Sequence, residues 1–225
     1  LYSGFNEICN QFKVELAGGD TVSSPQCFFI NVAVIGEAKR VFTRKGAKPG
    51  DLIFVTGTLG DSSLGLKLIG KKKKGGKDNK FLINRHLDPT PRVKEAGILA
   101  RSKLDITSMI DISDGLVQDL YHICKASNVG ARIYQDRLPT SPQFARTCGK
   151  NSISPLPLLL NGGEDYELLF TLPADGAKKL TRQFLKAKVF VTQVGEIALK
   201  PRKVILELRD GTTKTLPESE GFNHF

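Results

Sequence analysis

Several patterns that would place this chain in a familiar class are missing from its 225 residues. No apolar stretch reaches the roughly 20 residues that a helix needs to cross a bilayer. The longest such stretches lie around Cys27 to Ile35 and Leu156 to Leu160. The opening segment from Leu1 also lacks the basic, apolar and small-residue zones of a signal peptide. We therefore expect no membrane span and a soluble chain that is a fragment or was trimmed at its start.

Motifs for metal, redox or nucleophilic chemistry based on cysteine, histidine or serine are also missing. The four cysteines are widely scattered, at Cys9, Cys27, Cys124 and Cys148. No Cys-x-x-Cys pair indicates zinc or redox work, so we expect four reduced, mostly packed thiols in a cytoplasmic protein. The three histidines show no metal-binding spacing, and no Gly-x-Ser-x-Gly elbow presents a serine nucleophile.

The net charge of +10 is concentrated in a glycine-rich stretch that contains six lysines. They are Lys71, Lys72, Lys73, Lys74, Lys77 and Lys80. Their simplest interpretation is a solvated loop. No aromatic side chains alternate with them, which argues against nucleic-acid binding. A basic nucleic-acid-binding module nevertheless remains an alternative function.

Apolar periodicity predicts alternating helices and strands. Helices are expected over Tyr2 to Phe12, after Asp61-Ser62, around Val93 to Ala100, from Ser113 onward and over Asp175 to Ala187. Strands are expected over Cys27 to Ile35, Leu52 to Thr56, Ile106 to Ile112, Glu167 to Leu172, Val189 to Val194 and Val204 to Leu208. The two late strands and the Asp210-Gly211 turn argue against a purely parallel sheet. We predict an α+β sandwich of helices on a mixed sheet, with a domain boundary within 37–48.

Three short acidic motifs are the most informative feature that is present. They are Gly18-Gly19-Asp20-Thr21, Asp111-Ile112-Ser113-Asp114-Gly115 and Gly162-Gly163-Glu164-Asp165-Tyr166-Glu167. Each places carboxylates beside glycine turns near an apolar run. Such oxygen ligands suit hard cations that bridge phosphates. Phosphate chemistry is therefore the first hypothesis.

Each motif also has a purely structural interpretation. Asp20 fits an ordinary turn, while Ser113 is a natural helix cap that places Asp114 in the first turn. If the third motif were a strand, Glu164 and Tyr166 would face away from Asp165 and Glu167, so one site could not use all four. Glu164 is then the preferred functional residue, and a charged hairpin end is the alternative.

A turn and two arginines are candidate phosphate contacts. The turn Gly57-Thr58-Leu59-Gly60 before Asp61 could direct a helix N-terminus toward an anion, or could simply be a capped turn. Arg44 and Arg92 are possible clamps.

Taken together and in order, these segments resemble the thiamine-monophosphate kinase family. The matching segments are 18–21, 43–51, 55–62, 109–116, 162–168 and the closing Gly221-Phe222-Asn223-His224-Phe225. This resemblance implies the superfamily of aminoimidazole-ribonucleotide synthetase, in which an N-terminal α/β domain pairs in a dimer and ATP binds between it and a C-terminal α/β domain. Residues 1–40 would then be a remnant of the N-terminal domain, and 41–225 the complete C-terminal domain.

The implied reaction transfers the γ-phosphoryl group of ATP to thiamine monophosphate, with several Mg²⁺ ions. By position, the resemblance implies metal binding by Asp20, Asp111 and Asp114, and nucleotide binding by Gly19, Asp20, Arg44 and Ser113. It implies substrate binding by Glu164 and Phe222, and it assigns no catalytic residue firmly.

The resemblance has one large departure. Family members carry roughly one further domain's length, on the order of a hundred residues, before the point that matches Leu1, and it supplies more metal ligands. We therefore expect the chain alone to be inactive and its intact parent to be a homodimeric kinase. The alternatives are another ATP-using member of the superfamily, similar to selenophosphate or aminoimidazole-ribonucleotide synthetase, and the nucleic-acid module.

Overall fold

The computed structural model describes residues 1–69, 75–199 and 203–218, and it divides into two compact units. The first unit is Leu1–Lys39 and the second is Arg40–Phe225. Each unit is described by itself. Neither the described helices of the first unit nor those of the second combine the length and apolar character needed to cross a membrane.

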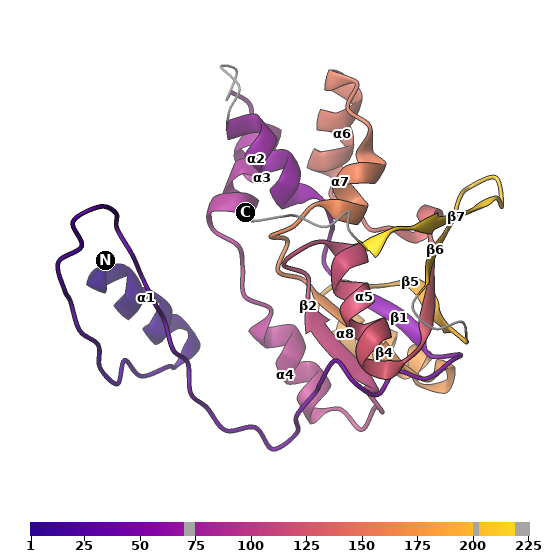
Figure 1. Ribbon diagram of the computed structural model, residues 1–225, viewed down its shortest axis with the longest axis horizontal. Helices are drawn as coiled ribbons and strands as arrows, with labels where there is room; N and C mark the ends of the chain where they lie inside the picture. The colour runs from indigo at the N-terminus through magenta and orange to yellow at the C-terminus, as the bar shows by residue number, and fades with distance from the viewer. Residues whose placement is uncertain (70–74, 200–202, 219–225) are drawn as a thin grey trace. The chain divides into compact units, whose positions relative to one another are not determined.

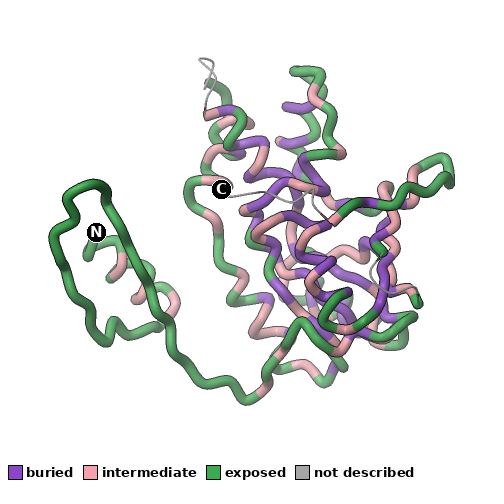
Figure 2. Tube along the Cα trace, in the orientation of Figure 1, coloured by how far each residue is buried: buried purple, intermediate pink, exposed green. Residues whose placement is uncertain are grey.

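The first unit contains helix α1 (Tyr2–Phe12), as the sequence predicts, and an irregular remainder. The strand predicted over Cys27 to Ile35 is wrong. This segment is not assigned to a strand, and its side chains are exposed, with Phe28 at 80% and Ile35 at 96% (Figure 2). A strand needs a neighbour to satisfy its backbone groups, and the described residues include none that pairs with this segment.

The described part of the second unit forms a seven-stranded sheet in the order β2-β4-β1-β5-β3-β6-β7 (Figure 1). The strands are β1 (Leu52–Thr56), β2 (Ser108–Asp111), β3 (Gly130–Tyr134), β4 (Leu168–Leu172), β5 (Val191–Ala198), β6 (Val204–Glu207) and β7 (Thr213–Leu216). β3 and β6 are parallel, whereas the other neighbours are antiparallel. The predicted mixed sheet is thus confirmed, as is the turn at Asp210-Gly211 between β6 and β7.

Helices pack on both faces of this sheet (Figure 1). They are α2 (Asp61–Ile69), α3 (Lys77–Leu87), α4 (Val93–Arg101), α5 (Leu116–Ser127), α6 (Pro142–Asn151), α7 (Pro155–Asn161) and α8 (Ala177–Lys186). Ile53 and Val55 of β1 join the apolar cluster that contains α5, whereas Phe54 joins the cluster of α4 and α8. The alternation follows from the two-residue period of a strand. It explains why β1 is almost wholly buried.

Several local predictions need correction. Lys77 and Lys80 lie in α3 rather than in a loop, while 71–74 fall outside the described residues. The apolar face predicted for 93–100 is only partly right, because Leu99 is buried but Val93 is 52% exposed. All four thiols are free. Cys124 and Cys148 are buried, but Cys27 is exposed rather than packed.

The sheet register gathers the polar segments of the second unit at one edge. Asp111, the last residue of β2, pairs with Leu168, the first residue of β4. Val55, one residue before the end of β1, pairs with Leu169. The segments that follow β1 and β2 and the segment that precedes β4 therefore meet at the same place.

Candidate active site

Backbone hydrogen bonds join the second and third acidic motifs at this edge. The N–H of Ile112 donates to the carbonyl of Glu167 at 2.8 Å, and the N–H of Tyr166 donates to the carbonyl of Ile112 at 2.9 Å. The N–H of Glu164 donates to the carbonyl of Ser113 at 2.7 Å. Two segments that are separated in the chain by α5, β3, α6 and α7 are thereby held side by side.

The corner between β2 and α5 is shaped differently from the sequence prediction. Helix α5 begins at Leu116, and Gly115, with φ 116°, is its N-cap. Ser113 is therefore not the cap, and Asp114 precedes the first turn. Asp119, inside the helix, is the hydrogen-bond acceptor for the backbone of this corner. One of its carboxylate oxygens accepts the N–H groups of Ser113 at 3.0 Å, Asp114 at 3.0 Å and Gly115 at 3.2 Å.

Negative charge accumulates around this corner. Burial raises the pKa of Asp119 to about 7, and the charges of Asp114 and Asp111 add to the rise against the opposing hydrogen bonds. Burial also raises the pKa of Tyr166, and the charges of Glu164, Asp111 and Asp114 raise it further. The charges of Glu164, Asp111 and Asp114 thus all affect the same side chain, that of Tyr166. Such a set of oxygen donors fits a divalent cation of the Mg²⁺ type.

A histidine also belongs to this corner. Ligand atoms of Asp114, Asp119 and His122 all lie within 4.8 Å of one another. His122 is half-buried and follows Asp119 by three positions on α5, so the two side chains share a helix face.

The third motif is not a strand. Glu164 and Tyr166 have left-handed backbones, with φ of 63° and 51°, which non-glycine residues rarely adopt. The consequence resembles the predicted alternation: Asp165 and Glu167 are buried, whereas Glu164 keeps 28% of its side chain exposed. Its Oε2 lies 3.2 Å from Nδ1 of His86, which also lies 3.0 Å from the Ser62 hydroxyl.

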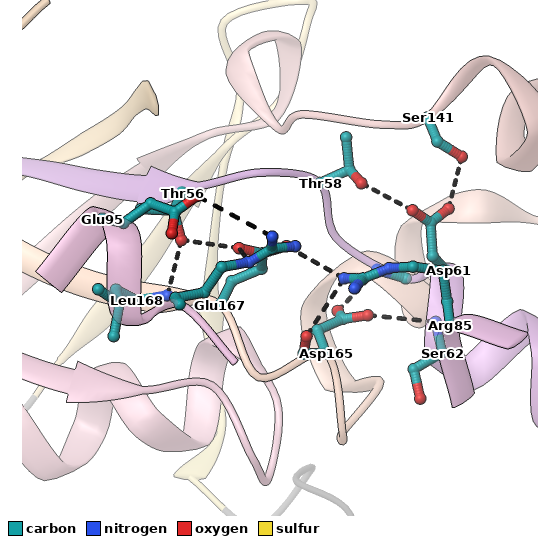
Figure 3. Close-up of polar contacts among 12 residues, drawn as sticks. Thr56, Thr58, Asp61, Ser62, Arg85, Glu95, Ser141, Asp165, Glu167 and Leu168 are labelled. Carbon is teal, nitrogen blue, oxygen red and sulfur yellow. Dashed lines mark hydrogen bonds and ion pairs between the residues drawn. The ribbon is translucent and has the colours of Figure 1, made fainter. Parts of the chain in front are cut away.

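Glu167 is the centre of a buried polar network (Figure 3). Its carboxylate accepts a hydrogen bond from the hydroxyl of Thr56 at 2.7 Å and pairs with Arg85 at 3.0 Å. Arg92 donates from Nε at 2.6 Å and also from Nη2. Arg92 is therefore held by an internal carboxylate, and its role as a phosphate clamp stays a prediction. Glu167 has a structural role at this edge.

The turn after β1 is occupied by an internal carboxyl group. Asp165 accepts the N–H groups of Gly60 at 2.7 Å and Ser62 at 3.2 Å, at the start of α2. Burial raises the pKa of Asp165 to about 7 despite these two bonds. At Gly57, with φ 54°, a Cβ would lie 2.2 Å from a carboxylate oxygen of Glu167, so the close approach requires glycine. The predicted anion-binding turn thus holds a carboxylate of the chain itself.

The structure brings some of the predicted site residues together and not others. Asp111, Ser113, Asp114 and Glu164 meet at the edge described above. Arg44 is exposed, and its carbonyl accepts a hydrogen bond from Ser127 at the opposite end of α5. Its role stays a prediction.

The remaining predicted residues lie elsewhere. Gly19 and Asp20 are exposed in the first unit, where the N–H of Thr21 donates to the Asp20 carboxylate at 2.8 Å. Phe222 lies outside the described residues.

Comparisons with known proteins identify the family of the chain. Residues 48–206 match the family described as AIR synthase related protein, C-terminal domain. A thiamine-monophosphate kinase of Buchnera aphidicola (subsp. Schizaphis graminum) is 39% identical over 223 residues, covering 98% of this chain and 67% of the relative. The chain belongs to the thiamine-monophosphate kinase family.

Two further matches are similar in extent. The thiamine-monophosphate kinase of Escherichia coli K12 is 38% identical and covers 97% of this chain and 66% of its own length. A solved structure, described as AaThiL complexed with AMPPCP and TMP, is 32% identical with a TM-score of 0.78 and covers 100% of this chain and 67% of its own. The chain thus spans about two thirds of the length of these family members.

Sequence reasoning missed Asp119, His86 and the buried arginine pairs. A signal for Asp119 was present, because it lies three positions after Leu116 and one before Leu120, on the buried face of α5. A carboxylate at such a position needs hydrogen-bond donors. No local signal marked Arg85 or Arg92, because their partner Glu167 is distant in the chain.

Proposed function

We propose that the protein transfers the γ-phosphoryl group of ATP to the phosphate of thiamine monophosphate, giving thiamine diphosphate and ADP. Membership in the family supports this activity, as does the relative solved with AMPPCP and TMP. The observation that carries the proposal is the joining of Asp111, Asp114 and Glu164 at one sheet edge by backbone hydrogen bonds. These bonds make the segment of the proposed metal ligands a direct neighbour of the segment of the proposed substrate carboxylate, which supports a shared site.

The chain's carboxylates would bind Mg²⁺ and the substrates in distinct roles. Asp111 and Asp114 are the proposed metal ligands at the corner, and Asp20 is a further ligand from the first unit. Mg²⁺ bound there would screen the phosphates, whose repulsion otherwise opposes attack of one on another. The attacking phosphate oxygen is already anionic at neutral pH, so no side chain need act as a base.

The other proposed roles concern substrate binding. Ser113 and Arg44 would contact ATP phosphates, with Gly19 beside the nucleotide. Glu164 would bind the thiamine end of the acceptor, and its partner His86 would orient the carboxylate. Phe222 would stack on the thiamine ring.

The domain assignment, dimer formation and location are part of the proposal. Residues 1–40 would belong to an N-terminal domain that pairs in a homodimer, and 41–225 would form the C-terminal domain. Free thiols support a cytoplasmic location.

A coupled assay of ADP release tests the reaction, using the natural full-length protein of which this sequence is all or part. We expect Mg²⁺-dependent turnover with thiamine monophosphate and its loss in Asp111→Asn. Turnover with selenide or with formylglycinamidine ribonucleotide, but not with thiamine monophosphate, would instead assign the protein to another branch of the superfamily. Tight, salt-sensitive binding of nucleic acid without ADP release would contradict the kinase proposal altogether.

A further inference from the structure

Asp119 holds the loop that carries the proposed metal ligands without being one of the residues predicted for the site. It lies on α5, directly beneath the corner 112–115, and it is 1% exposed. A single carboxylate oxygen, Oδ2, accepts three consecutive backbone N–H groups, those of Ser113, Asp114 and Gly115.

This arrangement fixes the backbone of the corner. Successive N–H groups that converge on one carboxylate oxygen form a concave nest, and the three bonds tie three consecutive residues to one side chain of α5. Gly115 makes the close turn possible, because its φ is 116° and a Cβ would lie 3.0 Å from the backbone of Asn161. The path of the chain from Ser113 to Gly115 is therefore set by one carboxylate.

The position of the nest matters because of what projects from it. Asp111 precedes it at the end of β2, and Asp114 lies inside it. Glu164 is tied to the same loop, since its N–H donates to the carbonyl of Ser113 at 2.7 Å. A shift of the loop would therefore move Asp114 relative to Asp111, which the pairing of β2 with β4 holds in place.

We propose that Asp119 is a positioning residue, whose carboxylate holds loop 113–115 so that Asp111 and Asp114 can bind a divalent cation together. The inference rests on the proposed function for the identity of the cation and the reaction. It assigns no contact between Asp119 and substrate. Removal of the Asp119 carboxylate should weaken metal binding. At other metal sites, changes to residues that orient the metal ligands lower metal affinity or activity about 10- to 100-fold.

Asp51 offers a matched control. It is also buried, at 4% exposure, and its carboxylate accepts the N–H of Lys48 at 2.8 Å and the hydroxyl of Thr107 at 2.7 Å. It precedes β1, at the edge of the sheet opposite the site. Asp51→Asn therefore disturbs a comparable buried carboxylate away from the proposed metal ligands.

The test compares Asp119→Asn, Asp51→Asn and the natural full-length protein by direct Mn²⁺ binding and amide hydrogen exchange. We expect Asp119→Asn to weaken Mn²⁺ binding at least about 10-fold and to speed exchange of the 113–115 amides. Asp51→Asn should leave both unchanged, although both variants should melt at lower temperature. Equal Mn²⁺ affinity in Asp119→Asn and the natural protein, or an equal loss in both variants, would overturn the inference.

A second variant keeps the test decisive if Asp119→Asn does not fold. Asp119→Glu retains the charge but displaces the carboxylate by one methylene, so the same loss of Mn²⁺ affinity is expected, and unchanged affinity would overturn the inference. These measurements need no turnover. Failure of the natural protein to release ADP with thiamine monophosphate would therefore refute the proposed function separately, without deciding the role of Asp119.

Discussion

One arginine-paired carboxylate, Glu167, and a group of three others lie at the same sheet edge in different electrostatic surroundings. Glu167 is fully buried, pairs with two arginines and accepts a hydrogen bond from a threonine hydroxyl. At the same edge, Asp111, Asp114 and Glu164 remain at least partly exposed, and their charges add to the effect of burial in raising the pKa of Tyr166. The difference separates the carboxylate that maintains the fold from those that we propose to bind metal and substrate.

The arginine-paired group should dominate stability. Glu167→Gln leaves the half-buried Arg85 without its carboxylate partner and leaves Arg92 with the more distant Glu95, 4.0 Å away. We therefore expect a loss of about 3 kcal/mol in the free energy of unfolding, the lower end of the range for a broken buried pair. Urea denaturation measures it. A loss below about 1 kcal/mol, the usual range of an exposed pair, would remove the proposed distinction between the two groups.

The exposed group should dominate activity instead. Asp111→Asn removes a proposed metal ligand, and we expect turnover to fall at least about 100-fold, the upper end of the losses seen for indirect metal contacts. The free energy of unfolding should change by no more than about 0.5 kcal/mol, because the side chain is exposed. Steady-state kinetics and urea denaturation of the same preparation check both parts. Loss of stability without loss of turnover would reverse the assignment.

Asp165 lies between Glu164 and Glu167 in the sequence, and its ionisation should oppose folding. Its pKa is raised to about 7 from an ordinary 3.8, so the native state retains a proton that the unfolded state releases. Its contribution to stability is therefore full below about pH 4 and is lost as pH rises toward 7. Between pH 5 and pH 7, the natural protein should lose on the order of 2 kcal/mol relative to Asp165→Asn. Denaturation curves at a series of pH values measure this difference, and parallel pH dependence in the two proteins would show that Asp165 ionises normally.

A solvent-exposed pair should matter least. Arg132 and Glu207 pair at 2.8 Å on neighbouring strands β3 and β6, with 40% and 34% of their side chains exposed. Glu207→Gln should cost less than about 1 kcal/mol, and less again at high salt. Urea denaturation at low and high salt tests this expectation. A cost equal to that of Glu167→Gln would mean that burial does not explain the difference.

Local patterns predicted much of the fold. Apolar periodicity predicted the helices from Ser113 onward and over Asp175 to Ala187. In the structure, Leu116, Val117, Leu120, Ile123 and Cys124 of α5 are all buried, as are Leu180 and Phe184 of α8. The strand over 27–35 failed although its apolar pattern was strong, because a strand depends on a partner that its own residues do not specify. The cap at Ser113 failed for a related reason: Asp119, one turn into the helix, supplied the acceptor.

For the site, the residue types indicated phosphate and metal chemistry but not the geometry. The carboxylates beside glycines at Asp111, Asp114 and Glu164 predicted the kind of site. Which acidic residues pair with arginines could not be predicted. The sequence favoured Glu164 over Asp165 and Glu167 by assuming a strand, whereas in the structure left-handed backbones at Glu164 and Tyr166 produce the separation.

The sequence by itself determined the family, the mixed α/β class and the presence of three acidic motifs, because these depend on residue identity and short-range periodicity. Only the tertiary structure decided that Glu167 pairs with Arg85 and Arg92, and that Asp119 holds the loop of Asp114. Thr56 and Glu167 are 111 positions apart. Contacts over such separations depend on how strands and helices pack, which no local pattern encodes. The burial that this packing creates pairs Glu167 with two arginines, whereas Asp111 at the same edge stays exposed to solvent.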